Sequence, residues 1–294
     1  MRRMHLRYRG FNFVMMPLLI DTTRFHSYNM GRIVRKGVYS VVARIDFNCD
    51  MGESFGIHKL GFDEKVIKYI TSANIACGFH SGDPSWMRRT VELAGDNSVA
   101  IGAHTSFPDL IGFGRRNMAV SHDEVRDYVV YQIGALAGFV KSNKLQHVKP
   151  HGAMYNMAVS DESIARAICQ AVLDVDANLI LVVLFGSKWH KIACEMGLRV
   201  AREVFADRAV NLDGSLVDRS KEGAVISDPD EVVQRSLQMV LDGSVTSISG
   251  ERIPIEVDTL CMHGDTPGAV EIAKNIKATF EEHRVQVIPM GSFI

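Results

Sequence analysis

Short apolar runs alternate with longer helix-periodic segments from Val41 onward, and this alternation limits the fold more than any other feature of the chain. Seven runs have the length of a strand: 41–47, 73–77, 98–103, 146–149, 179–185, 198–204 and 256–262, with a candidate eighth at 285–288. This pattern predicts parallel strands joined by helical crossovers. A chain of 294 residues can bury one large core of this α/β class.

Helix starts between the runs are marked by an N-cap residue followed by Pro at the first helical position. The three pairs are Asp83-Pro84, Asp228-Pro229 and Thr266-Pro267. Ser121 and Glu124 form a capping box. The helix after it carries apolar residues at three- and four-residue spacings, which predicts one buried face: Val125, Val129, Ile133, Leu136 and Val140. Residues 45–294 contain no repeat or linker, so we predict a single domain.

The first 44 residues differ in composition from the rest of the chain. They hold nine Lys and Arg against Asp21 alone. The apolar stretch 11–20 is too short to span a bilayer and contains Pro17. No small-x-small cleavage site follows it, although the Arg-rich composition also resembles an organellar transit peptide. We interpret residues 1–44 as a poorly ordered extension outside the fold.

The remaining residues exclude several classes of function. Beyond residue 44 the chain has 24 basic and 33 acidic residues, and this acidic body argues against nucleic acid as a partner. The five cysteines are widely spaced and contain no C-x-x-C pair. Neither a disulfide framework nor a zinc knuckle is indicated, and a cytoplasmic protein without a membrane anchor is expected.

Polar and titratable residues follow almost every apolar run. Because the carboxyl ends of parallel strands face one side of a barrel or sheet, these side chains are expected to converge there. The predicted constellation contains Asp46, Asp50, His80, His104, His151, Glu203, His263 and Asp265. Local roles are the alternative: Asp83 is better explained as an N-cap, and Asp265 as part of the helix start near Pro267.

Two glycine-flanked loops, 112–118 and 211–226, are flexible enough to close over such a site. They carry Arg115, Arg116 and Arg219. The planar guanidinium of arginine suits a carboxylate or phosphate ligand. The default explanation for these three arginines is that they are solvated surface charges. The sequence contains no P-loop, H-E-x-x-H or G-x-S-x-G motif.

Taken together, these segments resemble the LamB/YcsF family. The matching stretches run in order from about Ile45 to the C-terminus: DFNCDMGESFG, SANIACGFHSGDP, IGAHTSFPDLIGFGRR, YQIGALAGF, HVKPHGAMYN, REVFADR, DGSLVDRSKEGAVI and CMHGD. The long stretches ANIACGFHSGD and HVKPHG make the match specific. Thr105 stands where the family often has Pro, and the first 44 residues have no family counterpart.

The resemblance implies an irregular seven-stranded (β/α) barrel similar to glycoside hydrolase and polysaccharide deacetylase domains. It also implies ATP-dependent hydrolytic opening of 5-oxo-L-proline (pyroglutamate) to L-glutamate, with Mg²⁺ as the usual counter-ion of ATP. Two partners, the B and C subunits of a 5-oxoprolinase, are implied as well. A five-membered lactam is a stabilised amide, so coupling its hydrolysis to ATP makes chemical sense.

The residues allow three mechanisms. For acid–base catalysis we select the side chains expected at the first four strand ends: Asp46, Asp50, His80, His104 and His151. For substrate binding we select Asn48, Asn74, Lys149, Arg115, Arg116, Glu203, His263 and Asp265. A metal-dependent amide hydrolase or deacetylase is the second mechanism, with Asp50, His80 and His104 as ligands. The third is a non-catalytic subunit that only binds the substrate.

Overall fold

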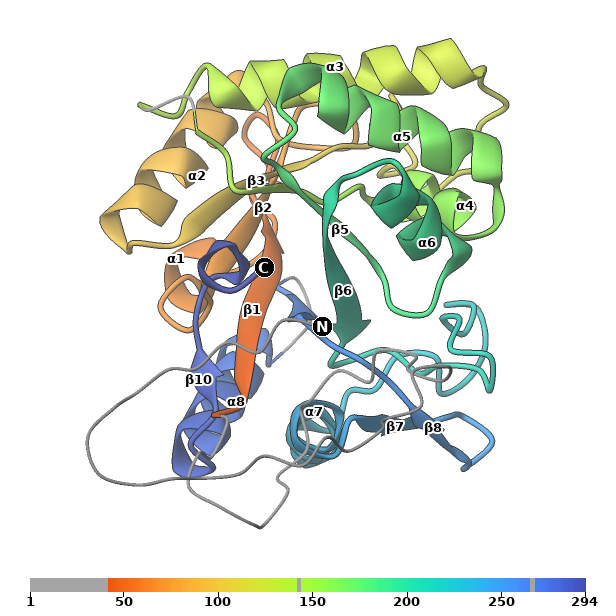
Figure 1. Ribbon diagram of the computed structural model, residues 1–294. Helices are drawn as coiled ribbons and strands as arrows, with labels where there is room; N and C mark the ends of the chain where they lie inside the picture. Colours follow the sequence, from red (N-terminus) through yellow and green to blue (C-terminus); the bar gives the residue numbers. More distant parts are fainter. Residues whose placement is uncertain (1–41, 142–143, 265–267) are drawn as a thin grey trace, which may run out of the picture.

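Seven parallel strands close into a barrel in the computed structural model, which describes residues 42–141, 144–264 and 268–294 (Figure 1). The strands are β1 (Arg44–Met51), β2 (Ser72–Ala76), β3 (Ala100–His104), β4 (His147–Val148), β5 (Ile180–Leu184), β6 (Arg199–Phe205) and β9 (Thr259–His263). Neighbours pair in this order, and β9 pairs with both β6 and β1, which closes the barrel. β10 (Gln286–Val287) adds to the first residues of β1. The predicted α/β barrel is therefore confirmed.

All seven predicted runs, and the eighth, overlap a strand. The first predicted run lies too early, because β1 ends at Met51 rather than at Phe47. Asp46, Asn48 and Asp50 therefore lie within β1, not after it. In the sequence, the appearance of polar side chains among apolar ones suggested that the strand had ended. In the structure these polar side chains belong to the strand and line the inside of the barrel. The hairpin of β7 (Ser244–Thr246) and β8 (Arg252–Pro254) was not predicted.

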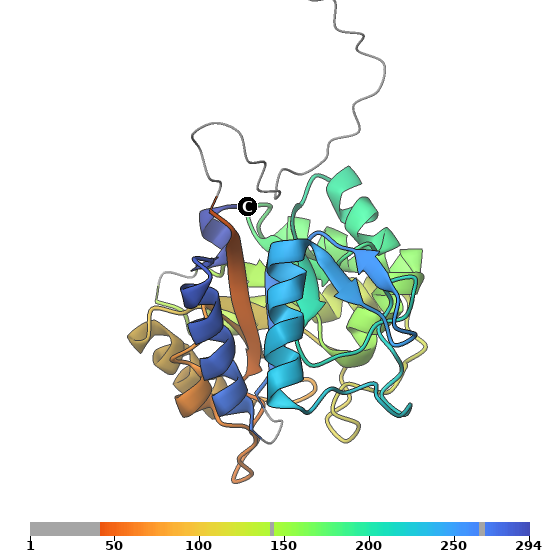
Figure 2. The same ribbon diagram turned by 90° about the horizontal axis from the view of Figure 1, so that it is seen from below.

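Helices surround the barrel. They are α1 (Asp63–Val66), α2 (Pro84–Asp96), α3 (His122–Ala137), α4 (Gly152–Ser160), α5 (Glu162–Val175), α6 (Lys188–Glu195), α7 (Pro229–Leu237) and α8 (Ala269–Glu282). A π-helix, η1 (Gln238–Asp242), extends α7, and the 3₁₀-helix η2 (Met290–Ser292) lies near the C-terminus. Figure 1 shows α3 and α5 packed side by side, and Figure 2 shows α7 beside α8.

Most of the predicted helix starts are confirmed. The Asp83 side chain accepts hydrogen bonds from the backbone N–H groups of Ser85 and Trp86, and Asp228 caps α7. The capping box before α3 is present. α8, however, begins at Ala269 after Gly268, two residues later than predicted. Thr266 and Pro267 lie outside the described residues.

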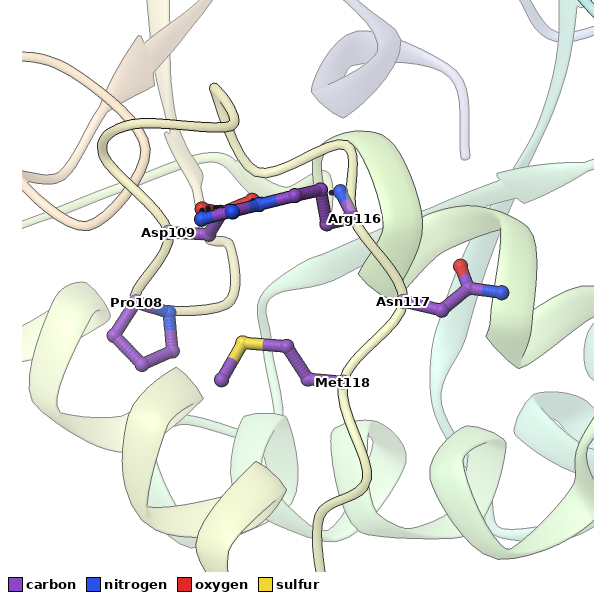
Figure 3. Close-up of a pocket in the computed structure, with 5 residues that line it drawn as sticks. All are labelled: Pro108, Asp109, Arg116, Asn117 and Met118. Atoms are coloured by element: carbon purple, nitrogen blue, oxygen red, sulfur yellow. Dashed lines mark hydrogen bonds and ion pairs between the residues drawn. The ribbon is translucent and has the colours of Figure 1, made fainter.

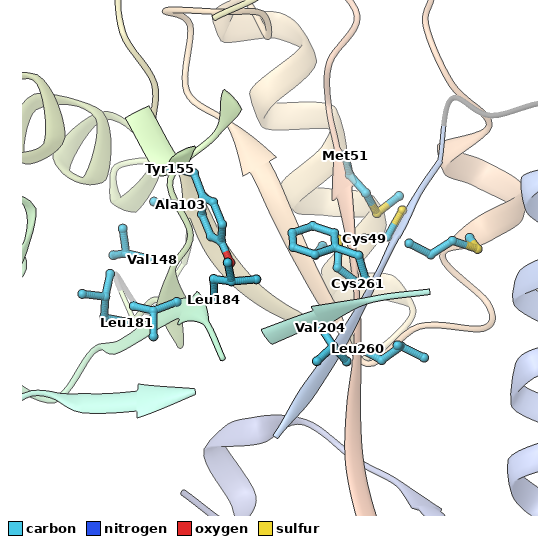
Figure 4. Packing of buried hydrophobic residues seen from close by; sticks show 14 of the residues in the cluster. Cys49, Met51, Ala103, Val148, Tyr155, Leu181, Leu184, Val204, Leu260 and Cys261 are labelled. Carbon is cyan, nitrogen blue, oxygen red and sulfur yellow. The ribbon is translucent and has the colours of Figure 1, made fainter. Parts of the chain in front are cut away.

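Alternation along β1 divides the molecule into two interiors. Ile45, Phe47, Cys49 and Met51 are buried in the apolar layer between strands and helices, part of which Figure 4 shows. The alternate residues of β1 point into the barrel and are polar. At the amino ends of the strands the barrel interior is closed by an apolar cluster of Ile180, Val182, Ala201 and Met290. A polar layer therefore fills the barrel from its middle to the carboxyl ends of the strands.

The division into an extension (1–44) and a barrel (45–294) stays a prediction, because residues 1–41 lie outside the described part of the chain.

Candidate functional site

Three histidines and one glutamate meet at the carboxyl ends of β1 to β4. Glu53 follows β1, His80 follows β2, His104 ends β3 and His151 precedes α4. One nitrogen or oxygen of each of these side chains lies within 4.8 Å of the corresponding atoms of the others. Glu53 Oε1 is 3.0 Å from His80 Nε2 and 3.5 Å from His151 Nδ1. We call these four residues the histidine cluster.

Backbone carbonyls orient the rings of the histidine cluster. His104 Nδ1 lies 2.7 Å from the Lys149 carbonyl oxygen, and His151 Nε2 lies 2.9 Å from the Phe113 carbonyl oxygen. The rings of His80 and His151 stack at 3.9 Å between centroids. Burial lowers the pKa of His80 and of His151 well below the usual range. Both rings are therefore neutral near pH 7.

A buried ion pair lies directly beneath the histidine cluster. Lys149 Nζ is 2.9 Å from Asp50 Oδ1 and 3.0 Å from Glu203 Oε1. Burial opposes both charges, but His104 and Lys149 hold the Asp50 pKa well below its usual range. Asp50 and its neighbours likewise hold the Lys149 pKa well above its usual range. Asp50 Oδ2 is also 3.3 Å from His104 Nε2, so the ion pair and the cluster are continuous.

Amide side chains hold this ion pair in place. Asn74 Nδ2 donates to Asp50 Oδ1 and to Asn48 Oδ1, each at 2.8 Å. Asn48 Nδ2 donates in turn to Thr259 at 2.6 Å. His147 Nε2 lies 2.7 Å from Asn74 Oδ1. The two asparagines predicted to orient substrate are thus buried and hydrogen-bonded to Asp50 and Lys149, and their role in substrate binding stays a prediction.

Asp46 lies away from the histidine cluster, near the amino end of β1. Its carboxylate accepts hydrogen bonds from Thr71, Ser72 and Thr259, and from the Met290 backbone N–H. Burial raises the pKa of Asp46 from its usual 3.8 to about 6, although these hydrogen bonds oppose the shift. The structure therefore does not bring Asp46 together with the other predicted acid–base residues.

His263 belongs to a second polar group beside β9. Its Nδ1 is 2.8 Å from Asp207 Oδ2, and its Nε2 is 2.9 Å from Arg219 Nη2. Burial lowers the His263 pKa, but the Asp207 carboxylate outweighs this effect and the net shift is upward. The same contact holds the pKa of Asp207 below its usual range, against the effect of burial.

The two arginines of the 112–118 loop differ in their surroundings. The Arg116 guanidinium pairs with Asp109, with Nε 3.0 Å from Oδ1. Both residues line a pocket of about 310 Å³ with Pro108, Asn117 and Met118 (Figure 3). No residue of the histidine cluster lines this pocket. Arg115 is exposed and lies over the Phe113 ring, which contacts His80 and His151 edge-on. Asp265 lies outside the described residues.

Sequence reasoning did not select Glu53 or Asp207. Glu53 follows Asp50 by three residues in DMGES, and Gly52 with φ +69° turns the chain between them. Asp207 follows β6 in the quoted stretch REVFADR. The position of each residue after a strand was the available signal. Asp46, Asp50 and Glu203 lie earlier in the same two segments. Their position near a strand end is an equally strong signal, so they were selected instead.

The histidine cluster fits a divalent metal by the chemistry of its donors. Three imidazoles and one carboxylate are a ligand set that zinc favours, and a carbonyl oxygen that accepts a hydrogen bond from the second ring nitrogen is a usual support. His104 and His151 each have such a carbonyl. Two of the three predicted ligands, His80 and His104, belong to the cluster. The third, Asp50, is paired with Lys149 instead.

Comparison with known proteins gives a consistent result. The sequence model of the LamB/YcsF family matches residues 45–294. The A subunit of the 5-oxoprolinase of Pyrococcus abyssi is 56% identical over 253 residues, covering 85% of this chain and 99% of that protein. The protein of the same name from Clostridium beijerinckii is 54% identical, covering 84% and 98%.

Solved structures agree with the sequence matches. The lactam utilization protein of Thermus thermophilus superposes with a TM-score of 0.80 at 45% identity, covering 83% of this chain and 99% of that one. A putative cellobiose-phosphate cleavage protein of Enterococcus faecalis superposes with a TM-score of 0.55 at 14% identity, covering 85% and 98%. The second similarity shows the fold alone.

Proposed function

This chain belongs to the LamB/YcsF family, and on that basis we propose that it is the A subunit of a 5-oxoprolinase, which opens 5-oxo-L-proline to L-glutamate. The observation that carries the proposal is the identity of more than half of the aligned residues over nearly the whole length of relatives with that name. The site supports it, because it places groups that accept and donate protons at the open end of a barrel.

The proposed reaction consumes ATP and two water molecules. Transfer of the γ-phosphoryl group to the amide oxygen leaves ADP and turns that oxygen into a better leaving group. Water then adds to the ring carbon, the C–N bond breaks as the nitrogen takes a proton, and an acyl phosphate remains. A second water releases phosphate and L-glutamate. Where ATP and its Mg²⁺ bind is part of the proposal and is not assigned to particular residues.

The histidine cluster supplies the proton transfers in this proposal. Glu53 contacts His80 and His151, so the carboxylate and a neutral imidazole can share the proton taken from water. Asp50, whose pKa His104 and Lys149 hold well below its usual range, keeps a negative charge 3.3 Å from His104 Nε2. A bound divalent metal would be held by the cluster and would supply a Lewis acid there.

The partner B and C subunits are also part of the proposal. The loops after β1 and β3 carry large apolar side chains in contact with solvent, and Ile57 and Ile111 are each 94% exposed. Exposed apolar groups near an active site are typical of protein–protein contact surfaces.

None of the described helices is long and apolar enough to cross a membrane. We expect the complex in the cytoplasm.

A metal-dependent amide hydrolase or deacetylase is the second candidate function, and the histidine cluster is the observation that favours it. Such an enzyme would be active as an isolated chain, without ATP. The third candidate, a non-catalytic binding subunit, predicts that substitutions in the cluster leave the activity of the complex unchanged.

One experiment separates the first two of these candidates. The purified chain is incubated with 5-oxo-L-proline and ATP, alone and with the B and C subunits, and glutamate, phosphate and bound metal are quantified. Glutamate that requires ATP and the partners supports the proposal. Failure of every combination to yield glutamate, together with stoichiometric metal, would favour the metal-dependent hydrolase.

A further inference from the structure

Asp207, His263 and Arg219 form a polar group that the proposed proton transfers do not use; we call it the Arg219 group. His263 ends β9 and is paired in register with Asp50 of β1. Residues paired in register on adjacent parallel strands project to the same face of the sheet and lie at the same height along it. The side chains of His263 and Asp50 therefore lie at the same end of the barrel. The Arg219 group therefore lies next to the site described above.

The hydrogen bonds of the Arg219 group set the tautomer of the neutral form of its imidazole. A guanidinium only donates, so His263 Nε2 accepts from Arg219 Nη2 at 2.9 Å. His263 Nδ1 then carries the proton and donates to Asp207 Oδ2 at 2.8 Å. Asp207 is 3% exposed and contacts the ring nitrogen that Arg219 does not.

The loop that carries Arg219 is held at both ends by another arginine. Arg208 is only 6% exposed, and its guanidinium donates to the carbonyl oxygens of Val217 at 2.6 Å and Ala224 at 3.3 Å. Val217 and Ala224 also pack with Ala209 in a small apolar cluster of their own. The turn between them, which contains Arg219, is therefore positioned before any ligand arrives. Pre-positioning reduces the entropy lost when a ligand binds.

The other cations near the site have different surroundings. Lys149 is buried in its ion pair with two carboxylates. Arg116 is paired with Asp109 beside a pocket that no residue of the histidine cluster lines. Arg115 is exposed but lies over the Phe113 ring. Arg219 is exposed, and it donates to the histidine that pairs in register with Asp50. Its guanidinium fork matches the two oxygens of a carboxylate.

We propose that Arg219 binds the carboxylate of a cyclic amide acid and so selects carboxylated lactams over plain ones. His263 and Asp207 are positioning residues that aim the guanidinium. This assignment rests on the proposed function, because 5-oxo-L-proline carries one carboxylate beside the ring nitrogen. Arg115 and Arg116, which were selected from the sequence for substrate binding, are not assigned to this carboxylate.

Steady-state kinetics of the complete complex test the assignment. We expect Arg219→Met to raise KM for 5-oxo-L-proline roughly 10- to 100-fold while kcat stays within about twofold, as for a lost charged hydrogen bond that acts in binding. The KM of Arg219→Lys should lie between those of Arg219→Met and the wild type. Lys221→Met removes one positive charge from the same turn and is the matched control; its KM should equal that of the wild type.

Two further measurements separate recognition from general damage. The lactam 2-pyrrolidinone lacks the carboxylate, so Arg219→Met should lose the wild-type preference for 5-oxo-L-proline over it. His263→Asn should raise KM more than it lowers kcat, with an unchanged unfolding midpoint. A proportional loss of kcat in both variants would assign them a structural role and overturn the inference.

The outcome also distinguishes this inference from the proposed function. If the wild-type complex forms glutamate and Arg219→Met keeps the wild-type KM, the inference is wrong and the function stands. If no complex forms glutamate, binding of 5-oxo-L-proline to the isolated chain, measured by saturation-transfer NMR, decides the inference. Binding by the wild type that Arg219→Met loses supports it; equal binding, or no binding by the wild type, overturns it.

Discussion

Among single residues, Glu53 connects the three histidines. Its Oε1 is the atom that His80 Nε2 and His151 Nδ1 both approach, at 3.0 and 3.5 Å. A carboxylate in this place both orients the rings and accepts a proton from them. We therefore predict that Glu53 belongs to the acid–base set, because it lies with the three histidines.

Replacement of Glu53 tests this role. Glu53→Gln keeps the shape of the side chain and removes its charge, so we expect kcat for glutamate formation to fall roughly 10²- to 10⁴-fold, the usual contribution of general acid–base catalysis. Glu92→Gln, in an exposed pair with Arg88 on α2, is the control and should keep full activity. Full activity in Glu53→Gln would remove this residue from the mechanism.

Asp46 is expected to influence stability instead of catalysis. Its pKa is about 6 in the folded chain and 3.8 in its usual state. The folded state therefore binds the proton more tightly, and the stabilisation present below pH 3.8 is lost as the pH rises through 6. The loss amounts to about 3 kcal/mol at most over this interval.

Denaturant unfolding between about pH 3.5 and pH 7 measures this effect. Asp46→Asn cannot ionise, so the difference in unfolding free energy between the variant and the wild type should move in favour of the variant as the pH rises from about 4 to about 6. A difference that does not depend on pH would show that burial does not shift the pKa of Asp46. Asp63, whose pKa burial also raises to about 6, is unchanged in both proteins and cancels in the comparison.

Among the structural elements, the 112–118 loop seals one side of the histidine cluster. Gly114 has φ +63°, and a Cβ added there would lie 2.8 Å from His80 Cβ and 2.9 Å from His151 Cδ2. Phe113 contributes both its ring and its carbonyl oxygen to the same histidines. The close approach of this loop requires glycine, for reasons of space and of backbone conformation.

Gly114→Ala should therefore disturb the cluster. We expect it to cost roughly 1–3 kcal/mol of unfolding free energy, from strain and overpacking, and to reduce activity by more than the loss of folded protein explains. Gly134→Ala on α3 is the control, because no atom lies within 4 Å of its added Cβ. That variant should be as stable as the wild type or more stable by up to about 1 kcal/mol. Equal behaviour of the two variants would contradict the sealing role.

For the whole molecule, a metal bound by the cluster would join four strand ends. If the cluster binds Zn²⁺, free Zn²⁺ at about 100 times its Kd should raise the unfolding free energy by about 2.7 kcal/mol. His151→Asn should abolish the increase, as followed by thermal unfolding with and without a chelator. Cys194→Ser removes an exposed thiol near His190 and should leave the increase unchanged. Persistence of the effect in His151→Asn would place the metal elsewhere.

The exposed apolar loops bear on assembly of the complex. Ile57→Asn and Ile111→Asn should weaken the binding of partner subunits and lower the activity of the complex, while the isolated chain remains folded. Val175→Asn, at the end of α5, introduces the same group at another exposed apolar site and is the control. Affinity measured by titrating the chain into its partners checks this, and unchanged affinity in both loop variants would exclude this surface.

Local sequence patterns were enough to predict parallel strands joined by helices and the approximate position of the site, whereas closure into a barrel was implied by the family resemblance. Strand runs, N-caps such as Asp83 and the capping box at Ser121 depend on neighbours a few residues away, so they can be identified from short stretches. His80, His104 and His151 come together as expected, because the carboxyl ends of parallel strands share one side of a barrel.

The identity of each side chain's partner, in contrast, depends on the folded chain. Lys149 and Glu203 are 54 positions apart, and His263 and Asp207 are 56 apart; their contacts depend on strand register, barrel closure and rotamer. The same closure places Asp46 near the amino end of β1 and Glu53 at the histidines, although the two residues are close in the sequence. The partners of a buried carboxylate then decide its charge: burial raises the pKa of both, but His104 and Lys149 hold the Asp50 pKa well below its usual range, while the hydrogen bonds of Asp46 do not outweigh burial.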